Sequence, residues 1–179
     1  MTREAFEHAI RAAGAVLGID EVLVIGSQAL HGSLLEPLPE AAARSVEVDV
    51  AVLGDTDGQM ADLIDGSIGE ASMFHATFGY YAQGVVEATA VLPAGWRERL
   101  VAFKAPGTNG VVAMCLEPHD LWISKAIAGR PKDTEFCQAL LEIGLVGGDL
   151  LRERLTAVEE LPDRQRSTVA ARIPGAGTA

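Results

Sequence analysis

The run Val22-Leu23-Val24-Ile25-Gly26-Ser27, followed later by Ser45-Val46-Glu47-Val48-Asp49-Val50, determines the fold that we expect for this chain. The first run is short and continuously apolar, as buried strands are. In the second, side-chain alternation places Glu47 and Asp49 on one face of a strand, with Cα atoms roughly 6.5 Å apart. Two neighbouring carboxylates lose hydration against a sheet and repel each other, and a divalent cation relieves both penalties. The pair therefore predicts a metal site.

Composition bounds the class of protein. The 179 residues suit one domain, or one domain with an appendage, and 49% of them are hydrophobic, enough to bury a core. The two cysteines, Cys115 and Cys137, lack metal-ligand spacing, so we expect reduced core residues in a cytoplasmic protein. The amphipathic pattern starts directly after Met1, and no apolar run approaches a membrane span, so we expect neither a leader nor a membrane partner.

Charge is distributed unevenly along the chain. Fourteen basic residues against 25 acidic ones give a net charge of −11. Residues 45–96 contain eight acids and no Lys or Arg, whereas residues 97–132 contain six basic residues and three acids. The acidic half suits a cation and repels a phosphate backbone. A low isoelectric point also serves solubility alone, so the charge does not decide between these explanations.

Periodicity and turn residues predict the remaining elements. Helices are expected over residues 3–17, 28–31, 59–68, 118–129, 134–143, 148–160 and 164–172. Strands are expected over residues 21–25, 45–50, 74–81, 84–92 and 110–116, with 74–81 and 84–92 forming a meander or hairpin. Residues 32–44 are expected to be a loop, because they contain Pro37 and Pro39.

Three features outside the acidic pair carry chemistry, each with a structural alternative. Ser27 at a helix start could bind phosphate oxygens or serve as an ordinary N-cap. Glu87, the lone acid of an apolar strand, could be a third metal ligand or lie on the exposed face of an edge strand. Lys125, Arg130 and Lys132, at the end of one helix and the start of the next, could bind phosphates or form a solvated rim. Asp133 could be catalytic or cap the second helix.

Together, the apolar strand with Gly26-Ser27, the Glu47-x-Asp49 pair and the later Glu87 resemble the signature of the polymerase β-like nucleotidyltransferase superfamily. A second segment is similar to a helix pair of the abortive-infection type nucleotidyltransferase toxins and their uncharacterised relatives; its matching residues are Asp120, Leu121, Lys125, Arg130, Lys132 and Asp133. The resemblance covers roughly residues 20 to 145. It implies an α/β (α+β) fold, with a small mixed or antiparallel sheet flanked by helices. Residues 1–116 would form the nucleotidyltransferase-like core, residues 117–172 a C-terminal helical region packed on it, and residues 173–179 a disordered tail.

The resemblance also implies an activity: transfer of NMP from an NTP to a hydroxyl acceptor, with release of pyrophosphate. The implied metal ligands for Mg²⁺ or Mn²⁺ are Glu47, Asp49 and Glu87, and the implied catalytic residues are these three with Lys125. The implied nucleotide-binding residues are Gly26, Ser27, Lys125, Arg130 and Lys132. The acceptor would be tRNA, a protein or a small molecule, and the toxin-like segment implies an antitoxin partner.

The chain departs from the family pattern at two acids, since Glu47 and Glu87 stand where aspartate is usual. Mg²⁺ requires near-octahedral geometry, so longer side chains bear directly on whether the site is active. The second hypothesis is therefore a catalytically degenerate protein of this fold that binds a nucleotide or a protein partner. A third is an unrelated α/β domain in which Glu47 and Asp49 are simply solvated.

Overall fold

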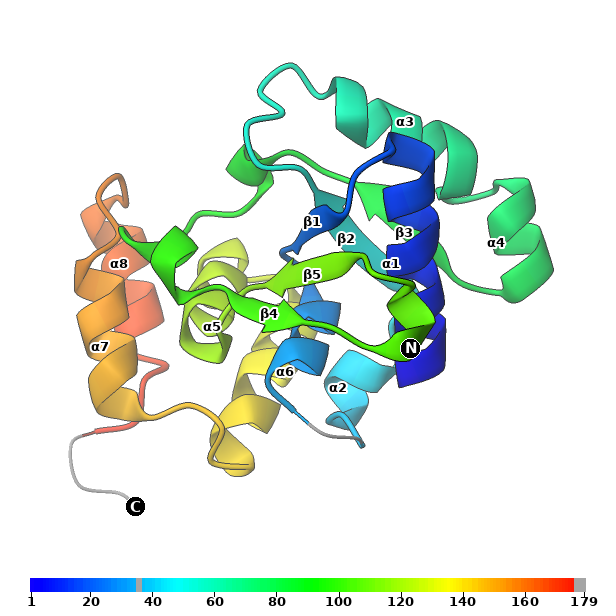
Figure 1. The fold of residues 1–179 in the computed structure, drawn as a ribbon. Coiled ribbons are helices and arrows are strands. Elements are labelled where there is room, and N and C mark those ends of the chain that lie inside the picture. The colour runs from blue at the N-terminus through cyan, green and yellow to red at the C-terminus, as the bar shows by residue number, and fades with distance from the viewer. Residues whose placement is uncertain (35–36, 176–179) are drawn as a thin grey trace.

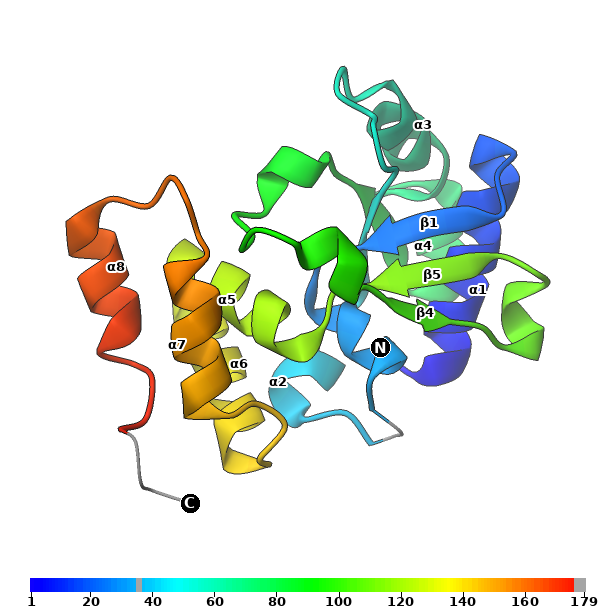
Figure 2. The ribbon, with the colours of Figure 1, turned by 60° about the vertical axis from the view of Figure 1, so that its left-hand side comes forward.

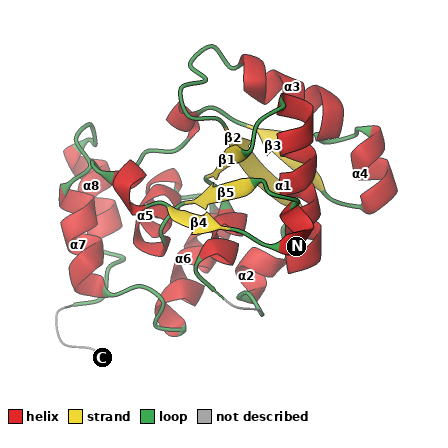
Figure 3. Ribbon diagram, viewed as in Figure 1, coloured by secondary structure: helices red, strands yellow, loops and turns green. Residues whose placement is uncertain are grey.

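A five-stranded mixed sheet forms the centre of the computed structural model, which describes residues 1–34 and 37–175 (Figures 1 and 3). Its strands are β1 (Glu21–Val24), β2 (Glu47–Ala51), β3 (Tyr81–Gly84), β4 (Val101–Phe103) and β5 (Val112–Cys115). Their order is β3-β2-β1-β5-β4. β1 runs antiparallel to β2 and parallel to β5, β3 runs parallel to β2, and β4 runs antiparallel to β5. The predicted fold class, a small mixed sheet flanked by helices, is confirmed.

The longer helices lie in two groups with the sheet between them, as both ribbon views show (Figures 1 and 2). One group consists of α1 (Arg3–Leu17), α3 (Gln59–Ile68) and α4 (Met73–Phe78). The other consists of α5 (Pro118–Ala128), α6 (Pro131–Glu142), α7 (Gly148–Thr156) and α8 (Asp163–Ala170). The four-residue α2 (Glu40–Ala43) lies against α6, and short 3₁₀ helices complete the chain: η1 (Ser27–Gly32), η2 (Glu87–Thr89), η3 (Trp96–Arg99) and η4 (Pro106–Thr108). No helix in the described ranges is long and apolar enough to span a membrane.

The predicted bounds of α1 and α3 are confirmed, and local signals explain those of α1. The Thr2 hydroxyl accepts a hydrogen bond from the Ala5 amide at 3.3 Å, and Gly18 ends the helix at φ +67°. The buried side of α1, which includes Phe6, Ala9 and Ile10, packs against the sheet and α3. This group of helices supports β1 and β2, the two strands that carry the predicted site.

Helix α5 connects the second group to the core. Its side chains Leu121, Trp122 and Ile123 are completely buried, and it contacts η1 of the core as well as α6, α7 and α8. The buried Asp120 carboxylate adds polar links, because it accepts from Arg99 Nε at 2.8 Å and pairs with Arg154 Nε at 3.3 Å. A single α-helix thus fixes the position of the basic residues at its own C-terminal end.

The predicted hairpin over residues 74–81 and 84–92 is wrong. Residues 73–78 form α4, and only Tyr81–Gly84 forms a strand, which pairs parallel with β2. The helix signals are local: the Ser72 hydroxyl accepts from the His75 amide at 3.1 Å, and Gly79 ends the helix at φ +75°. Glu87, expected within a strand, lies in η2.

Smaller predictions also need correction. The expected loop over 32–44 contains α2, and Val101–Phe103, for which no element was expected, form β4. Helix α6 starts at Pro131, three residues before the predicted start, because proline suits the first helical position. Residues 176–179 of the expected tail lie outside the described residues, while Ile173, its first residue, is buried at 8% exposure.

Candidate active site

Glu47 and Asp49 face a cavity of about 530 Å³ between the sheet, α2 and the facing ends of α5 and α6. It is lined by Ser27, Ala41, Arg44, Ser45, Glu47, Asp49, Lys125, Arg130, Pro131, Lys132, Asp133, Glu135 and Phe136. On β2 the side chains alternate as predicted, because Val48 and Val50 are buried and the two acids are partly exposed. The structure therefore brings six of the predicted site residues to one cavity, namely Ser27, Glu47, Asp49, Lys125, Arg130 and Lys132.

Gly26 lies directly against the Asp49 carboxylate. A Cβ atom at residue 26 would stand 1.5 Å from Asp49 Oδ2, far closer than any two unbonded atoms approach. The backbone of Gly26 is extended (φ −94°), so the glycine is needed for space and not for a left-handed conformation. A side chain at this position would therefore displace the Asp49 carboxylate.

The environment of Asp49 disfavours its charged form. Burial first, and then the neighbouring Glu47 charge, raise the pKa of Asp49 to about 6 from its usual 3.8, while Lys125 and Lys132 act in the opposite direction. A bound cation would favour the carboxylate form, because it supplies the opposite charge that the two acids lack.

Tyr81 holds the second carboxylate. The β2–β3 register places Tyr81 beside Glu47 and Gln83 beside Asp49. The Tyr81 hydroxyl donates to Glu47 Oε2 at 3.1 Å, and the Tyr81 ring is 8% exposed and lies 4.7 Å from the His75 ring. Burial, followed by the Glu47 charge, raises the pKa of Tyr81 to about 12, so the hydroxyl keeps its proton and remains a donor.

Asp133 holds part of the basic wall in place, the name we give to the four basic residues that line the cavity: Arg44, Lys125, Arg130 and Lys132. Its buried carboxylate accepts from Arg130 Nε at 2.6 Å and from the Arg130 amide at 3.2 Å, and it lies 3.7 Å from Lys125 Nζ. Burial acts to raise the pKa of Asp133, but the Arg130 hydrogen bonds and the charges of Lys125 and Arg130 outweigh it, and the pKa is lowered. Asp133 is the third residue of α6, and of its two predicted roles the structure shows the capping one, since its side chain accepts from the backbone of the N-cap residue Arg130.

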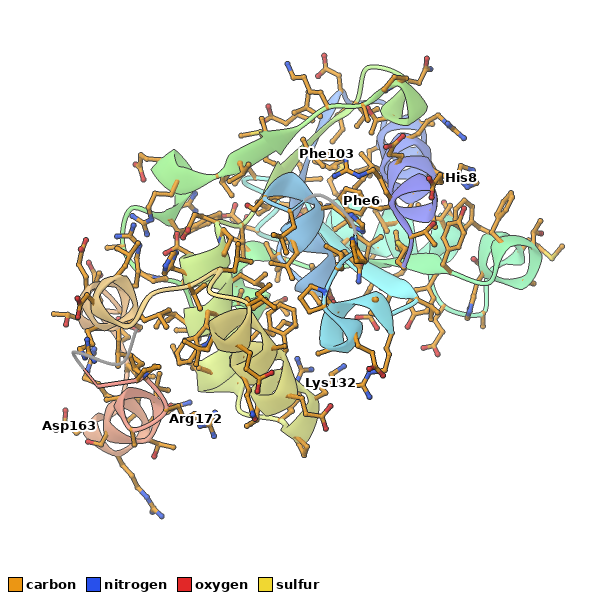
Figure 4. The ribbon with its side chains drawn as sticks, turned by 90° about the horizontal axis from the view of Figure 1, so that it is seen from below. Phe6, His8, Phe103, Lys132, Asp163 and Arg172 are labelled. Atoms are coloured by element: carbon orange, nitrogen blue, oxygen red, sulfur yellow. The ribbon has the colours of Figure 1, made fainter. Side chains whose placement is uncertain are left out.

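Two further basic residues border the cavity. Arg44, which follows α2, pairs with Glu135 of α6 at 2.7 Å, and both side chains are about 60% exposed. Lys132 lies where α6 comes beside α2 (Figure 4). The side chain of Gln28 helps to place α2, because it donates to the Ala42 carbonyl at 2.9 Å. The basic wall therefore comes from two segments that are about 80 residues apart in the sequence.

Glu87 lies outside the cavity lined by Glu47 and Asp49. One of its carboxylate oxygens accepts from the Gly54 amide at 2.7 Å, and the other pairs with Arg97. Among residues 1–34 and 37–175, no group of three or more His, Cys, Asp or Glu is placed to hold a metal ion. The structure does not bring the three predicted ligands together.

The chemistry of the remaining donors still fits one hard cation. Mg²⁺ takes oxygen ligands and is commonly bound by one or two carboxylates, with water and substrate phosphates completing its shell. Glu47 and Asp49 provide such a pair on adjacent outward positions of one strand. The two carboxylates therefore fit an ion that is completed by substrate oxygens, and they do not form a closed protein cage.

Several residues of the site could not be found from the sequence. Arg44 and Glu135 come together only through the packing of α2 on α6, and Tyr81 reaches Glu47 only through the parallel pairing of β3. His31, the last residue of the helix expected over 28–31, is 1% exposed and stacks on Phe6 at 4.6 Å, away from the cavity lining. Burial and then the Arg3 charge lower the pKa of His31 to about 4, which marks it as a neutral core residue.

Comparison with known families agrees with this geometry. Residues 4–171 match the model of the family described as "Nucleotidyltransferase of unknown function (DUF6036)", and the chain belongs to this family. The predicted membership of the nucleotidyltransferase superfamily is thus confirmed, whereas the closer resemblance to the toxins stays a prediction. No curated protein and no solved structure matches the chain.

Proposed function

We propose that this protein transfers NMP from an NTP to a hydroxyl acceptor in a reaction that depends on Mg²⁺ or Mn²⁺. The observation that carries the proposal is that acidic and basic side chains line the same cavity. Glu47 and Asp49 form one side, and Arg44, Lys125, Arg130 and Lys132 line the others. An acid pair suits a cation and the basic wall suits phosphates, so the cavity combines the two requirements of a metal–nucleotide complex.

In this proposal each side of the cavity has a separate task. Glu47 and Asp49 hold the cation, which neutralises phosphate charge when bound. Lys125, Arg130 and Lys132 bind the triphosphate, and Asp133 keeps the first two of them in place. Ser27 contributes a hydroxyl from the start of η1. The cavity volume of about 530 Å³ lies within the usual range for a small-molecule ligand.

The direct test is transfer of label from α-³²P-NTPs. Each of the four nucleotides is incubated with the protein and Mg²⁺, with acceptor pools of total tRNA, total soluble protein and small hydroxyl compounds. We expect one nucleotide to label an acceptor, and Asp49→Asn to reduce transfer by roughly a hundredfold or more without unfolding the protein. The matched control is Asp62→Asn, the same substitution at an exposed position of α3 outside the cavity.

Two outcomes contradict the proposal. Full transfer by Asp49→Asn would remove Asp49 from the metal site. Binding of an NTP without transfer to any acceptor would favour the alternative, a degenerate member of the fold that binds a nucleotide or a protein partner. The absence of a third carboxylate from the cavity is the observation that favours this alternative.

A toxin role belongs to the same proposal and rests on the resemblance of the segment from Asp120 to Asp133. Expression in the cytoplasm, where the two free buried cysteines would stay reduced, should then arrest growth. Growth arrest that also occurs with Asp49→Asn would separate toxicity from transfer. An antitoxin partner would be a protein whose co-expression restores growth.

A further inference from the structure

A second, smaller cavity of about 260 Å³ adjoins the candidate active site. Its lining includes Asp49, Lys125 and Arg130, and all three also line the larger cavity. The other lining residues are Ile25, Gly26, Thr89, Ala90, Ser124 and Ala128. The Asp49 carboxylate and two of the cations therefore line both spaces, which meet at these three side chains.

The two spaces differ in chemistry. The larger one has five additional charged residues, namely Arg44, Glu47, Lys132, Asp133 and Glu135. In the smaller one, the described lining residues add no charge beyond the shared three, and its own polar side chains are the hydroxyls of Thr89 and Ser124. A triphosphate therefore fits the larger space, whereas the smaller one suits an uncharged group that makes hydrogen bonds with hydroxyls.

Size and surroundings narrow the ligand further. About 260 Å³ is below the range of roughly 300 to 1,000 Å³ that holds drug-sized ligands, so the space suits a fragment smaller than a nucleotide. Thr89 and Ala90 belong to residues 45–96, which contain eight acids and no Lys or Arg. A polynucleotide acceptor would meet repulsion along this segment, and a small neutral molecule would not.

The geometry points to the smaller cavity as the acceptor subsite, taking a small uncharged molecule with a free hydroxyl group. This inference rests on the proposed function and names the acceptor class for the same site. In the step, the acceptor oxygen forms a bond to the α-phosphorus and the hydroxyl proton passes to water. The bond from that phosphorus to the oxygen bridging to the β-phosphorus breaks, and pyrophosphate leaves with the electron pair. The two reactants meet at Asp49, Lys125 and Arg130, the side chains that line both cavities.

Plugging the smaller cavity from two sides tests the assignment. Ala90 adopts an extended conformation that tolerates any side chain, and Ala128 is the exposed last residue of α5, so Ala90→Phe and Ala128→Phe fill the space from different elements. The matched control is Ala88→Phe, which adds the same ring at an exposed position of η2 outside both cavities. A second comparison is Lys132→Ala, which changes only the larger cavity.

Two measurements are made on each variant with Mg²⁺ present. Calorimetric titration with an α,β-methylene NTP reports the larger cavity, and transfer from labelled NTP to glycerol, ribose or glucose reports the pair of cavities. We expect both plugging variants to bind the NTP analogue like wild type and to lose transfer by about tenfold or more. Ala88→Phe should match wild type in both, and Lys132→Ala should bind the analogue more weakly.

The outcomes separate this inference from the proposed function. Wild-type levels of transfer by both plugging variants would overturn the subsite and leave the proposed function standing. Loss of analogue binding in both variants would show one merged site and also overturn it. Label found only on tRNA or only on protein would refute the acceptor class. An inactive wild type would refute the proposed function, and the inference with it.

Discussion

The Asp49 carboxylate occupies the space that a side chain at residue 26 would need, with Oδ2 only 1.5 Å from the Cβ position of an alanine there. Ile25 reinforces this pairing, because its amide donates to the Asp49 carbonyl at 3.3 Å. The glycine after β1 and the acid of β2 are thus one structural unit. The absence of a side chain at Gly26 leaves room for the Asp49 carboxylate, and this role does not depend on any contact with a phosphate.

Gly26→Ala should therefore displace the Asp49 carboxylate and abolish its role in cation binding. We expect Mn²⁺ affinity, measured by electron paramagnetic resonance, to fall by about tenfold or more, since one of two protein ligands moves. The control is Gly66→Ala in α3, where nothing lies within 4 Å of the new Cβ and φ is not positive. That substitution should stabilise the protein by about 0.5–1 kcal/mol. Unchanged Mn²⁺ binding in Gly26→Ala would mean that Asp49 does not bind the cation.

Glu87→Gln should retain metal binding and transfer. The amide can still accept from the Gly54 amide, and the lost Arg97 pair is solvent-exposed on the arginine side, so stability should change by less than about 1 kcal/mol. Glu47→Gln, the same substitution inside the cavity, should lose both functions. The readouts are the Mn²⁺ titration and labelled-NTP transfer. Loss of both in Glu87→Gln would restore Glu87 as the third ligand and would require η2 to move.

Stability should depend on pH through Asp49. Its folded pKa of about 6 lies above the ordinary 3.8, so its contribution is complete below about pH 3.8 and is lost as the pH rises through 6. The loss is at most about 3 kcal/mol, from a shift of about two units. It appears in urea unfolding as a fall in wild-type stability relative to Asp49→Asn between pH 4 and 7.

The comparison with Asp49→Asn is needed because His31 acts in the opposite direction. Its pKa is lowered to about 4, so its contribution to stability is lost as the pH falls from about 6.5, equally in both proteins. Mg²⁺ at pH 7 should restore the wild type alone, since only it has the carboxylate. Parallel pH curves for the two proteins would contradict the raised pKa of Asp49.

Tyr81→Phe should weaken cation binding without affecting the fold. The substitution removes the hydrogen bond that orients Glu47, and loss of such a supporting contact costs about tenfold or more in metal affinity. Tyr80→Phe is the matched control, because the Tyr80 hydroxyl bonds to His8 Nδ1 at 2.6 Å, away from the cavity. Mn²⁺ titration measures the difference. If raising the Mg²⁺ concentration fails to rescue transfer by Tyr81→Phe, its role is not positioning of a ligand.

The sequence was sufficient for elements with strong local signals. Helix α1, with its capping residues and helical periodicity, the apolar strand β1 and the alternating strand β2 all form as expected. Six of the predicted site residues line one cavity. Residues 74–81 were misassigned because their aromatic side chains favour strands, while the Ser72 and Gly79 caps select a helix. The prediction that Glu87 is a third metal ligand failed for a related reason, because it assumed a strand over residues 84–92, and Glu87 lies in η2 instead.

Contacts between distant segments lay beyond sequence reasoning. No local pattern pairs Tyr81 with Glu47 or Arg44 with Glu135, because each contact follows from tertiary packing. The same holds for the smaller cavity, whose walls come from the two residues after β1 and from β2, η2 and α5. Short apolar stretches such as β4 could not be assigned as strands because three residues carry too little periodicity.

The residues that line the larger cavity are formally neutral in sum. Arg44, Lys125, Arg130 and Lys132 face Glu47, Asp49, Asp133 and Glu135, four of each sign among the described residues. A triphosphate alone would bring a large excess of negative charge, and a cation alone would meet the four basic side chains. Binding of the two should therefore be cooperative, and by thermodynamic reciprocity each must lower the dissociation constant of the other by the same factor. Saturation with nucleotide would then set the metal concentration at which the protein responds.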